Sequence, residues 1–134
     1  MDGETAVSEA TTRGVLIHAA SQYEIERSAP QQGDYFFSYR VRIENLGAET
    51  VQLLSRLWII TDDSGSEQRV EGPGVVGETP TLAPGESFEY QSFCPLHSAF
   101  GTMQGHYVMR VVETGERFEA RILPFALAAP HAVN

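Results

Sequence analysis

Residues Val51–Thr61 are the least polar stretch of the chain and contain its only tryptophan, Trp58. Apolar side chains occupy both alternating phases of this stretch, with Leu57 on one face and Trp58 on the other. A run of this kind is typical of a β-strand that is covered on both sides. We therefore expect Val51–Thr61 to be a central strand of a layered β protein.

Alternation of apolar and polar side chains recurs along the rest of the chain. It is clearest over Tyr35–Glu44, where a shift of one residue would bury Arg40 and Arg42, so the register is well defined. No segment has a helical period. The expected strands are Val15–Glu26, Tyr35–Glu44, Val51–Thr61, Glu67–Glu71, Ser87–Cys94, Thr102–Glu113 and Arg117–Leu123. About seven short strands predict an all-β fold, an antiparallel β-sandwich of the Ig or fibronectin-III type.

The length and composition favour one small domain. We expect residues 1–12, which are polar and without period, to form a disordered tail, and residues 13–134 to form the sandwich. A net charge of −9 argues against a nucleic-acid partner. No apolar run is long enough to span a bilayer, so no membrane partner is expected. The single cysteine, Cys94, and the lack of a signal-peptide pattern favour a cytoplasmic location.

A glycine-rich segment, GPGVVG, follows the expected strand Glu67–Glu71 and matches the pattern G-x-G-x-x-G. In dinucleotide-binding folds this pattern needs a helix immediately afterwards, which the prolines that follow exclude here. Two interpretations stay open. The backbone amides form a nest for phosphate or pyrophosphate, or the glycines supply positive φ for a tight crossover between sheets. The residues of the anion-binding interpretation are Gly72, Gly74, Val75, Val76 and Gly77.

Two polar groups could carry chemistry, and for both we favour a structural interpretation. Cys94 and His97 have the spacing of a thiolate–imidazole pair, although a buried thiol beside a loop histidine is commoner. Asp62, Asp63 and Glu67 lack the calcium-loop pattern and are expected at a solvated hairpin tip. We expect no catalytic residue, no cofactor and no bound metal. Tyr35, Phe36, Phe93 and Phe100 are candidate exposed aromatics, which either mark a partner surface or pack against the loops and the tail.

Four phrases together resemble the ApaG family, also called the DUF525 domain. They are YFFSYRVRIENLG, VQLLSRLWIITD, GPGVVGETPTLAPGESFEYQS and GTMQGHY, and the resemblance extends from Gly14 to Asn134. It implies a fibronectin-III-like sandwich and an association with cobalt and magnesium resistance or efflux. The same domain occurs in F-box proteins and in a polymerase-interacting protein, which implies protein binding. Leu57 stands where the family commonly has histidine, and Phe93 where it commonly has glycine.

These observations predict a small soluble binding module that is not an enzyme. The loops Gly72–Pro80 and Pro95–Gly101 are expected to present its recognition surface to a protein partner. The alternative is a phosphate- or pyrophosphate-binding protein, or an enzyme acting on a pyrophosphate compound, that uses Gly72–Gly77. Because an open sandwich has free sheet edges, a homodimer is a further alternative.

Overall fold

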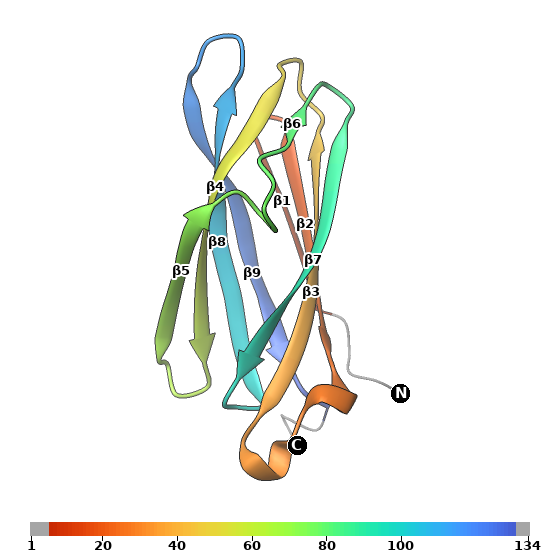
Figure 1. Cartoon of the computed structure of the whole chain (residues 1–134), viewed down its shortest axis with the longest axis vertical. Helices are drawn as coiled ribbons and strands as arrows, with labels where there is room; N and C mark the ends of the chain where they lie inside the picture. The colour runs from red at the N-terminus through yellow and green to blue at the C-terminus, as the bar shows by residue number, and fades with distance from the viewer. Residues whose placement is uncertain (1–5, 131–134) are drawn as a thin grey trace.

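The computed structural model describes residues 6–130, which form two antiparallel sheets packed face to face (Figure 1). One sheet has the strand order β1–β2–β3–β7, and the other has the order β5–β4–β8–β9, with β6 paired to β4. The strands are β1 (Ala6–Thr12), β2 (Val15–Tyr23), β3 (Tyr35–Asn45), β4 (Val51–Asp62), β5 (Glu67–Pro73), β6 (Thr81–Leu82), β7 (Ser87–Leu96), β8 (Phe100–Val111) and β9 (Arg117–Ala128). The predicted β-sandwich is confirmed.

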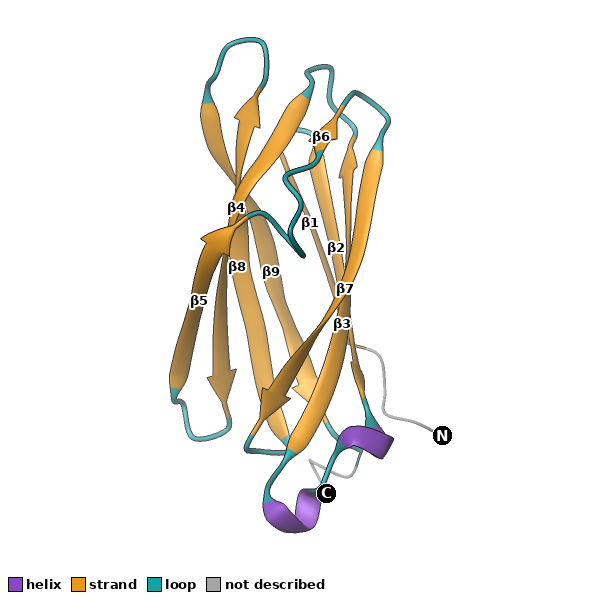
Figure 2. Cartoon of the chain, in the orientation of Figure 1, coloured by secondary structure: helices purple, strands orange, loops and turns teal. Residues whose placement is uncertain are grey.

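In the described part of the chain, helical structure is limited to two short 3₁₀ turns between β2 and β3, η1 (Ile25–Arg27) and η2 (Pro30–Gln32) (Figure 2). The first of them ends the predicted strand Val15–Glu26 early, at Tyr23, and leaves Ile25 exposed. Within residues 6–130, no helix is both long and apolar enough to cross a lipid bilayer.

Two strands were missing from the prediction. Residues 6–12, expected to be disordered, form β1 and pair with β2 from Ala6↔Ser21 to Thr12↔Val15. The order of this polar segment comes from that pairing and from contact with β9, where Ser8 Oγ donates to the Leu123 carbonyl oxygen over 2.8 Å. The remainder of the expected tail, residues 1–5, lies outside the described residues. The second missing strand, β6, has only two residues.

Several strand ends also differ from the prediction. β7 continues to Leu96 and β8 begins at Phe100, so the expected loop Pro95–Gly101 is reduced to residues 97–99. β9 passes through Pro124 and reaches Ala128, because the pairing of β8 with β9 shifts between Met103 and Gly105 and absorbs the proline in an irregularity.

Trp58 lies at the centre of the core, 2% exposed, on a strand with neighbours on both sides. It makes edge-to-face contacts with Tyr39, Tyr107 and Phe125, with ring centroids 5.2, 6.4 and 5.9 Å away. Such aromatic pairs stabilise a core beyond their buried area. The predicted buried tryptophan of a central strand is confirmed.

A β-bulge in β4 explains part of the unusual apolar pattern of this strand. The pairing of β4 with β8 shifts between Leu53 and Ser55, so Leu53 and Trp58 both contribute to the core although they have opposite parity. Leu57, on the outer face, is still only 7% exposed. Burial of both faces of β4, together with the bulge, explains why apolar residues occupy both alternating phases of this strand.

One hydrogen bond joins the two sheets in the middle of the core. The hydroxyl oxygens of Tyr90 on β7 and Tyr107 on β8 lie 2.6 Å apart, and both residues are buried. Burial raises the pKa of both phenols, because the charged phenolate would lose its hydration. Both hydroxyls therefore remain protonated and able to pair at neutral pH.

Candidate functional site

The glycine-rich segment lies on one side of the sandwich, where it crosses from β5 towards β6 (Figure 1). Gly72 is still part of β5, and the chain then turns sharply through Val75–Glu78. Val76 and Gly77, the two central residues of this turn, both have positive φ, at 43° and 81°. Val75 is 1% exposed and belongs to the core cluster. The segment thus plugs the gap between the two sheets with the Val75 side chain.

Backbone hydrogen bonds already occupy part of the expected anion nest. The amide of Gly74 donates to the Leu54 carbonyl over 2.9 Å, and the amides of Val75 and Glu78 donate to each other's carbonyl oxygens over 2.8 Å. Among the described residues, no acceptor lies on the amides of Val76 and Gly77. Anion binding by this loop stays a prediction, and it depends on these two amides. The crossover interpretation accounts for the positive φ of Gly74 and Gly77.

Arg56 on β4 is a part of this site that the sequence reasoning missed. Its Nη1 atom donates to the carbonyl oxygens of Pro73 and Gly74, over 3.0 and 2.9 Å. A Cβ atom on Gly72 would lie 3.1 Å from Nη2, so glycine leaves room for the guanidinium group. A lone arginine within an otherwise apolar run was the available signal. Arg56 holds the crossover loop against the strand.

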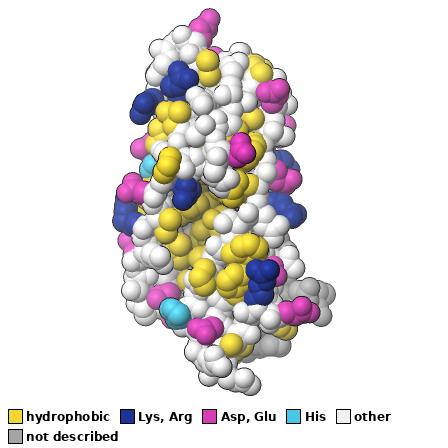
Figure 3. Space-filling view, in the orientation of Figure 1, with side chains coloured by type: hydrophobic (Ala, Val, Ile, Leu, Met, Phe, Trp, Pro, Cys, Tyr) yellow, Lys and Arg dark blue, Asp and Glu magenta, His cyan; other side chains and the backbone are white. Residues whose placement is uncertain are grey.

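The two long sides of the sandwich differ. On one side β1 and β9 close the gap, through the Ser8 bond and through the Arg121 amide, which donates to Thr12 Oγ1 over 3.2 Å. On the other side β5 and β7 are free edges, and a band of hydrophobic side chains shows between them (Figure 3). We call this side the open side, and it is defined by β5 (Glu67–Pro73) and β7 (Ser87–Leu96). The crossover loop covers only its upper part.

The lower part of the open side contains a cavity of about 350 Å³. Its walls are residues 66–68, at and just before the start of β5, and residues 95–97, at and just after the end of β7, with Ile60 of β4 between them. Asp62 and Glu67 make its rim acidic, and Leu96 is buried beneath it. The cavity thus combines apolar walls, which suit an apolar side chain, with an acidic rim, which suits a neighbouring basic group.

An aromatic cluster with one arginine flanks the same side. The rings of Phe36 and Phe93 are stacked with centroids 5.5 Å apart, and the guanidinium of Arg27 lies 4.9 Å from the Phe93 ring centroid and 5.5 Å from that of Phe36. Phe93 is 45% exposed and Phe100 is 36% exposed, while Tyr35 and Phe36 are half-buried. We call Arg27, Phe36 and Phe93 the aromatic cluster.

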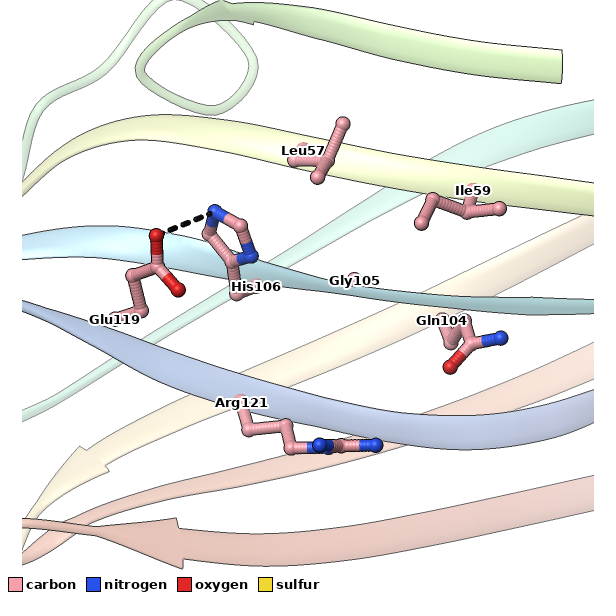
Figure 4. Close-up of a pocket in the computed structure, with 7 residues that line it drawn as sticks. All are labelled: Leu57, Ile59, Gln104, Gly105, His106, Glu119 and Arg121. Carbon is pink, nitrogen blue, oxygen red and sulfur yellow. Dashed lines mark ion pairs between the residues drawn. The ribbon is translucent and has the colours of Figure 1, made fainter.

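A second, shallower cavity of about 280 Å³ lies on the outer face of β4, β8 and β9 (Figure 4). His106 stands directly opposite Leu57, and its Nε2 atom is 3.6 Å from Glu119 Oε2. In Figure 4 the Glu119 carboxylate points towards the imidazole ring, and Arg121 extends away from it. The Glu119 side chain is exposed, and a contact of this kind contributes little to stability even when the histidine is charged.

The other candidate groups lie apart from these cavities or are already engaged. The Asp62 carboxylate accepts hydrogen bonds from the Ser64 hydroxyl and from the amides of Ser64 and Ser66, which lower its pKa. This is the hairpin tip that the sequence predicts. Within the described part of the chain, no three His, Cys, Asp or Glu side chains are grouped in a way that could hold a metal ion.

Cys94 and His97 differ in their surroundings. The Cys94 side chain is buried in the core, whereas the His97 side chain is 89% exposed and lies 3.5 Å from Asp34, measured from Nδ1 to Oδ1. Burial raises the pKa of Cys94 from 9.0 to about 11. A thiol with a raised pKa is a poor nucleophile at neutral pH.

We expect the Cys94 thiol to be inert in the folded protein. Because the folded-state pKa exceeds the unfolded value by about two units, the thiolate fraction near pH 8 falls about 100-fold on folding. Reaction with a disulfide reagent should therefore be at least about 100-fold slower in buffer than in denaturant. The proton on Cys94 stabilises the fold fully below pH 9 and less as the pH rises towards about 11. Equal rates in the two solvents would contradict the buried position.

Comparison with known proteins gives a consistent result. Residues 25–111 match the family model described as the ApaG domain, DUF525. The chain is 49% identical over 121 residues to Protein ApaG of Xanthobacter autotrophicus, covering 90% of this chain and 92% of that protein. It is 50% identical over 116 residues to Protein ApaG of Shewanella loihica, covering 87% and 91%.

Solved structures agree with the sequence matches. A crystal structure of an ApaA protein from Bordetella pertussis superposes with a TM-score of 0.84 at 47% identity, over 87% of this chain and 94% of that one. The C-terminal domain of Wzt superposes with a TM-score of 0.51 at 10% identity, over 91% and 77%, a likeness of fold alone.

Proposed function

The chain belongs to the ApaG domain family, and we propose that it works as a small binding module, not an enzyme, whose ligand is another protein. The observation that carries this proposal is the aromatic cluster of Arg27, Phe36 and Phe93 beside the open side. Aromatic and arginine side chains are enriched at the centres of protein interfaces, where they contribute most of the binding energy. Here they sit on strands and a short turn of a rigid frame.

The setting we propose for such a module is the one associated with the family, cobalt and magnesium resistance or efflux. We place the protein in the cytoplasm, where a single buried thiol such as Cys94 stays reduced. Its effect on divalent cations would then be indirect, through the partner.

The experiment is capture of partners from a native lysate by the immobilised protein. We expect Phe93→Gln to reduce the captured protein at least about tenfold, since an aromatic hot spot commonly contributes 2 kcal/mol or more. The matched control is Val112→Gln, because Val112 is 39% exposed and lies in the turn directly after β8, away from the aromatic cluster. Equal losses in both variants, or none in Phe93→Gln, would count against the aromatic cluster as the binding surface.

A second candidate function is binding of phosphate or pyrophosphate, or turnover of a pyrophosphate compound, at the crossover loop. The observation in its favour is the pair of amides on Val76 and Gly77, which have no acceptor among the described residues. Titration with pyrophosphate should then shift the amide resonances of these two residues selectively. Unchanged resonances at saturating pyrophosphate would remove this function.

A further inference from the structure

The β7 edge on the open side has no strand paired to it among the described residues. The hydrogen bond from the Asn45 amide to the Glu86 carbonyl oxygen, 2.9 Å long, sets the phase of the β3–β7 ladder. Bonding positions then recur at every second residue of β7, including Tyr90 and Ser92. It follows that Glu89, Gln91 and Phe93 direct their amide and carbonyl groups away from β3. These outward groups recur at every second residue, which is the repeat needed to pair with one further strand.

The neighbouring free edge, β5, is protected against pairing. The bonds Asp62 N to Ser66 O and Gly74 N to Leu54 O set its phase, so the outward backbone groups belong to Glu67, Arg69 and Glu71. All three side chains are charged, and charged residues on an edge strand discourage the addition of another strand. The outward positions of β7 are Ser87, Glu89, Gln91, Phe93 and Pro95, of which only Glu89 is charged and only Pro95 lacks an amide. β7 is therefore the edge that remains free to pair.

The surroundings of β7 specify what an added strand would need. Its inward side chains would cover the band between the sheets, where Ile60, Val70 and Phe88 pack against the core and remain half-exposed. One of them would reach the cavity of about 350 Å³. Alternate residues of the strand should therefore be apolar, as in other cases of strand addition to a sheet edge.

Charge bears on the other residues of the added strand, those that do not face the core. Glu67 and Asp62 line the cavity, which is where the acidic groups of this side gather. On the outer face, Glu89 of β7 stands opposite Arg42 of β3, and Arg40 donates from Nη2 to Gln91 Oε1 over 3.2 Å. The whole chain has a net charge of −9. A second copy of the chain would bring two acidic molecules together, whereas a basic segment would be attracted.

We propose that β7 accepts an extended segment of a partner protein as an additional strand, and that apolar residues alternate with basic ones in this segment. The proposal rests on the protein-binding function given above and names its mode and the chemistry of the partner. It explains why the sandwich is closed by β1 and β9 on one side only. The bound segment closes the other side.

The test uses a short capped peptide of alternating valine and lysine, with an alternating valine and glutamate peptide as its control. Amide hydrogen exchange is followed residue by residue in the full chain. The basic peptide should slow exchange at Glu89, Gln91 and Phe93 at least about tenfold, because these amides gain acceptors. Exchange at Glu67, Arg69 and Glu71 of β5 should stay unchanged, and the acidic peptide should protect neither set.

A pair of proline variants tests the same point by affinity. Gln91→Pro removes the central outward amide of β7 and no backbone bond to β3, at an edge position where sheets tolerate proline. It also removes the exposed side-chain bond from Arg40 Nη2 to Gln91 Oε1. It should weaken binding of the basic peptide at least about tenfold, while Arg69→Pro, the matched change on β5, should leave it unchanged. If Gln91→Pro does not fold, the exchange measurement on the unaltered protein decides.

Three outcomes overturn the proposal. One is resonance shifts at Phe93 without protection of the β7 amides, which would show contact with the surface but no strand addition. Another is concentration-dependent protection of β7 without peptide, which would assign the edge to a second copy. The third is equal binding of both peptides, or of neither. If lysate capture still depends on Phe93 in these cases, the module function stands and only the strand addition fails.

Discussion

Gly105→Ala should destabilise the protein by about 3 kcal/mol or more, the upper range for overpacking. Gly105 lies opposite Trp58 where β8 crosses the centre of its sheet. A methyl group there would overlap the Leu57 carbonyl oxygen and lie 3.2 Å from the Trp58 Cα atom. Because all of these atoms are backbone, relief requires the separation of two central strands. Urea unfolding followed by Trp58 fluorescence measures the loss.

The control for this variant is Gly33→Ala. Gly33 has a φ of 75° but has no atom within 4 Å of an added Cβ, so only the backbone strain of about 1 kcal/mol should appear. A Gly105→Ala protein that is no less stable than Gly33→Ala would mean that β4 and β8 do not approach each other as closely as the structure has them.

The second large effect is expected in the crossover loop, where Gly74→Ala should cost about 2–3 kcal/mol. Gly74 has a φ of 61°, and an added Cβ would overlap the Glu78 carbonyl oxygen, the acceptor for the Val75 amide. The variant should therefore displace the Val75 plug and loosen the contact with Arg56. Thermal unfolding and the near-ultraviolet circular dichroism of the aromatic core are the measurements.

Gly77→Ala is the matched change within the same loop. Gly77 also has positive φ, at 81°, but an added Cβ meets no atom within 4 Å, so about 1 kcal/mol is expected. The comparison separates the two interpretations of the glycine motif. If the glycines serve only as an exposed anion nest, both variants should be nearly equal in stability. If they build a crossover, Gly74→Ala should be clearly the less stable.

The architecture was predictable because the alternation of side chains is a local property. The alternating residues Phe37, Tyr39, Val41 and Ile43 of β3 and Trp58 of β4 are buried as the pattern indicates. β1 was not predictable in the same way. Its small and polar residues bury little surface of their own, and the strand is ordered by pairing to β2 and by the bond from Ser8 to β9. β9, which supplies the second of these contacts, lies far away in the sequence.

The candidate site shows the same limit. The motif located the glycine loop correctly, but the sequence could not reveal that the amides of Gly74 and Val75 are used within the fold. Nor could a period of two detect the bulge at Leu54, which sets which side chains of β4 face the core beside Arg56. The distinction between a closed and an open side depends on how the two sheets face each other, and only the structure supplies that.

The hydroxyl contact between Tyr90 and Tyr107 has a consequence for how this molecule meets its partners. This hydrogen bond opposes sliding of one sheet over the other. Sliding would break it and leave two buried hydroxyl groups without a partner. The two sheets are therefore held in a fixed position relative to each other at the core. A ligand that binds at the sheet edges meets a preorganised protein, so the protein loses little conformational entropy on binding.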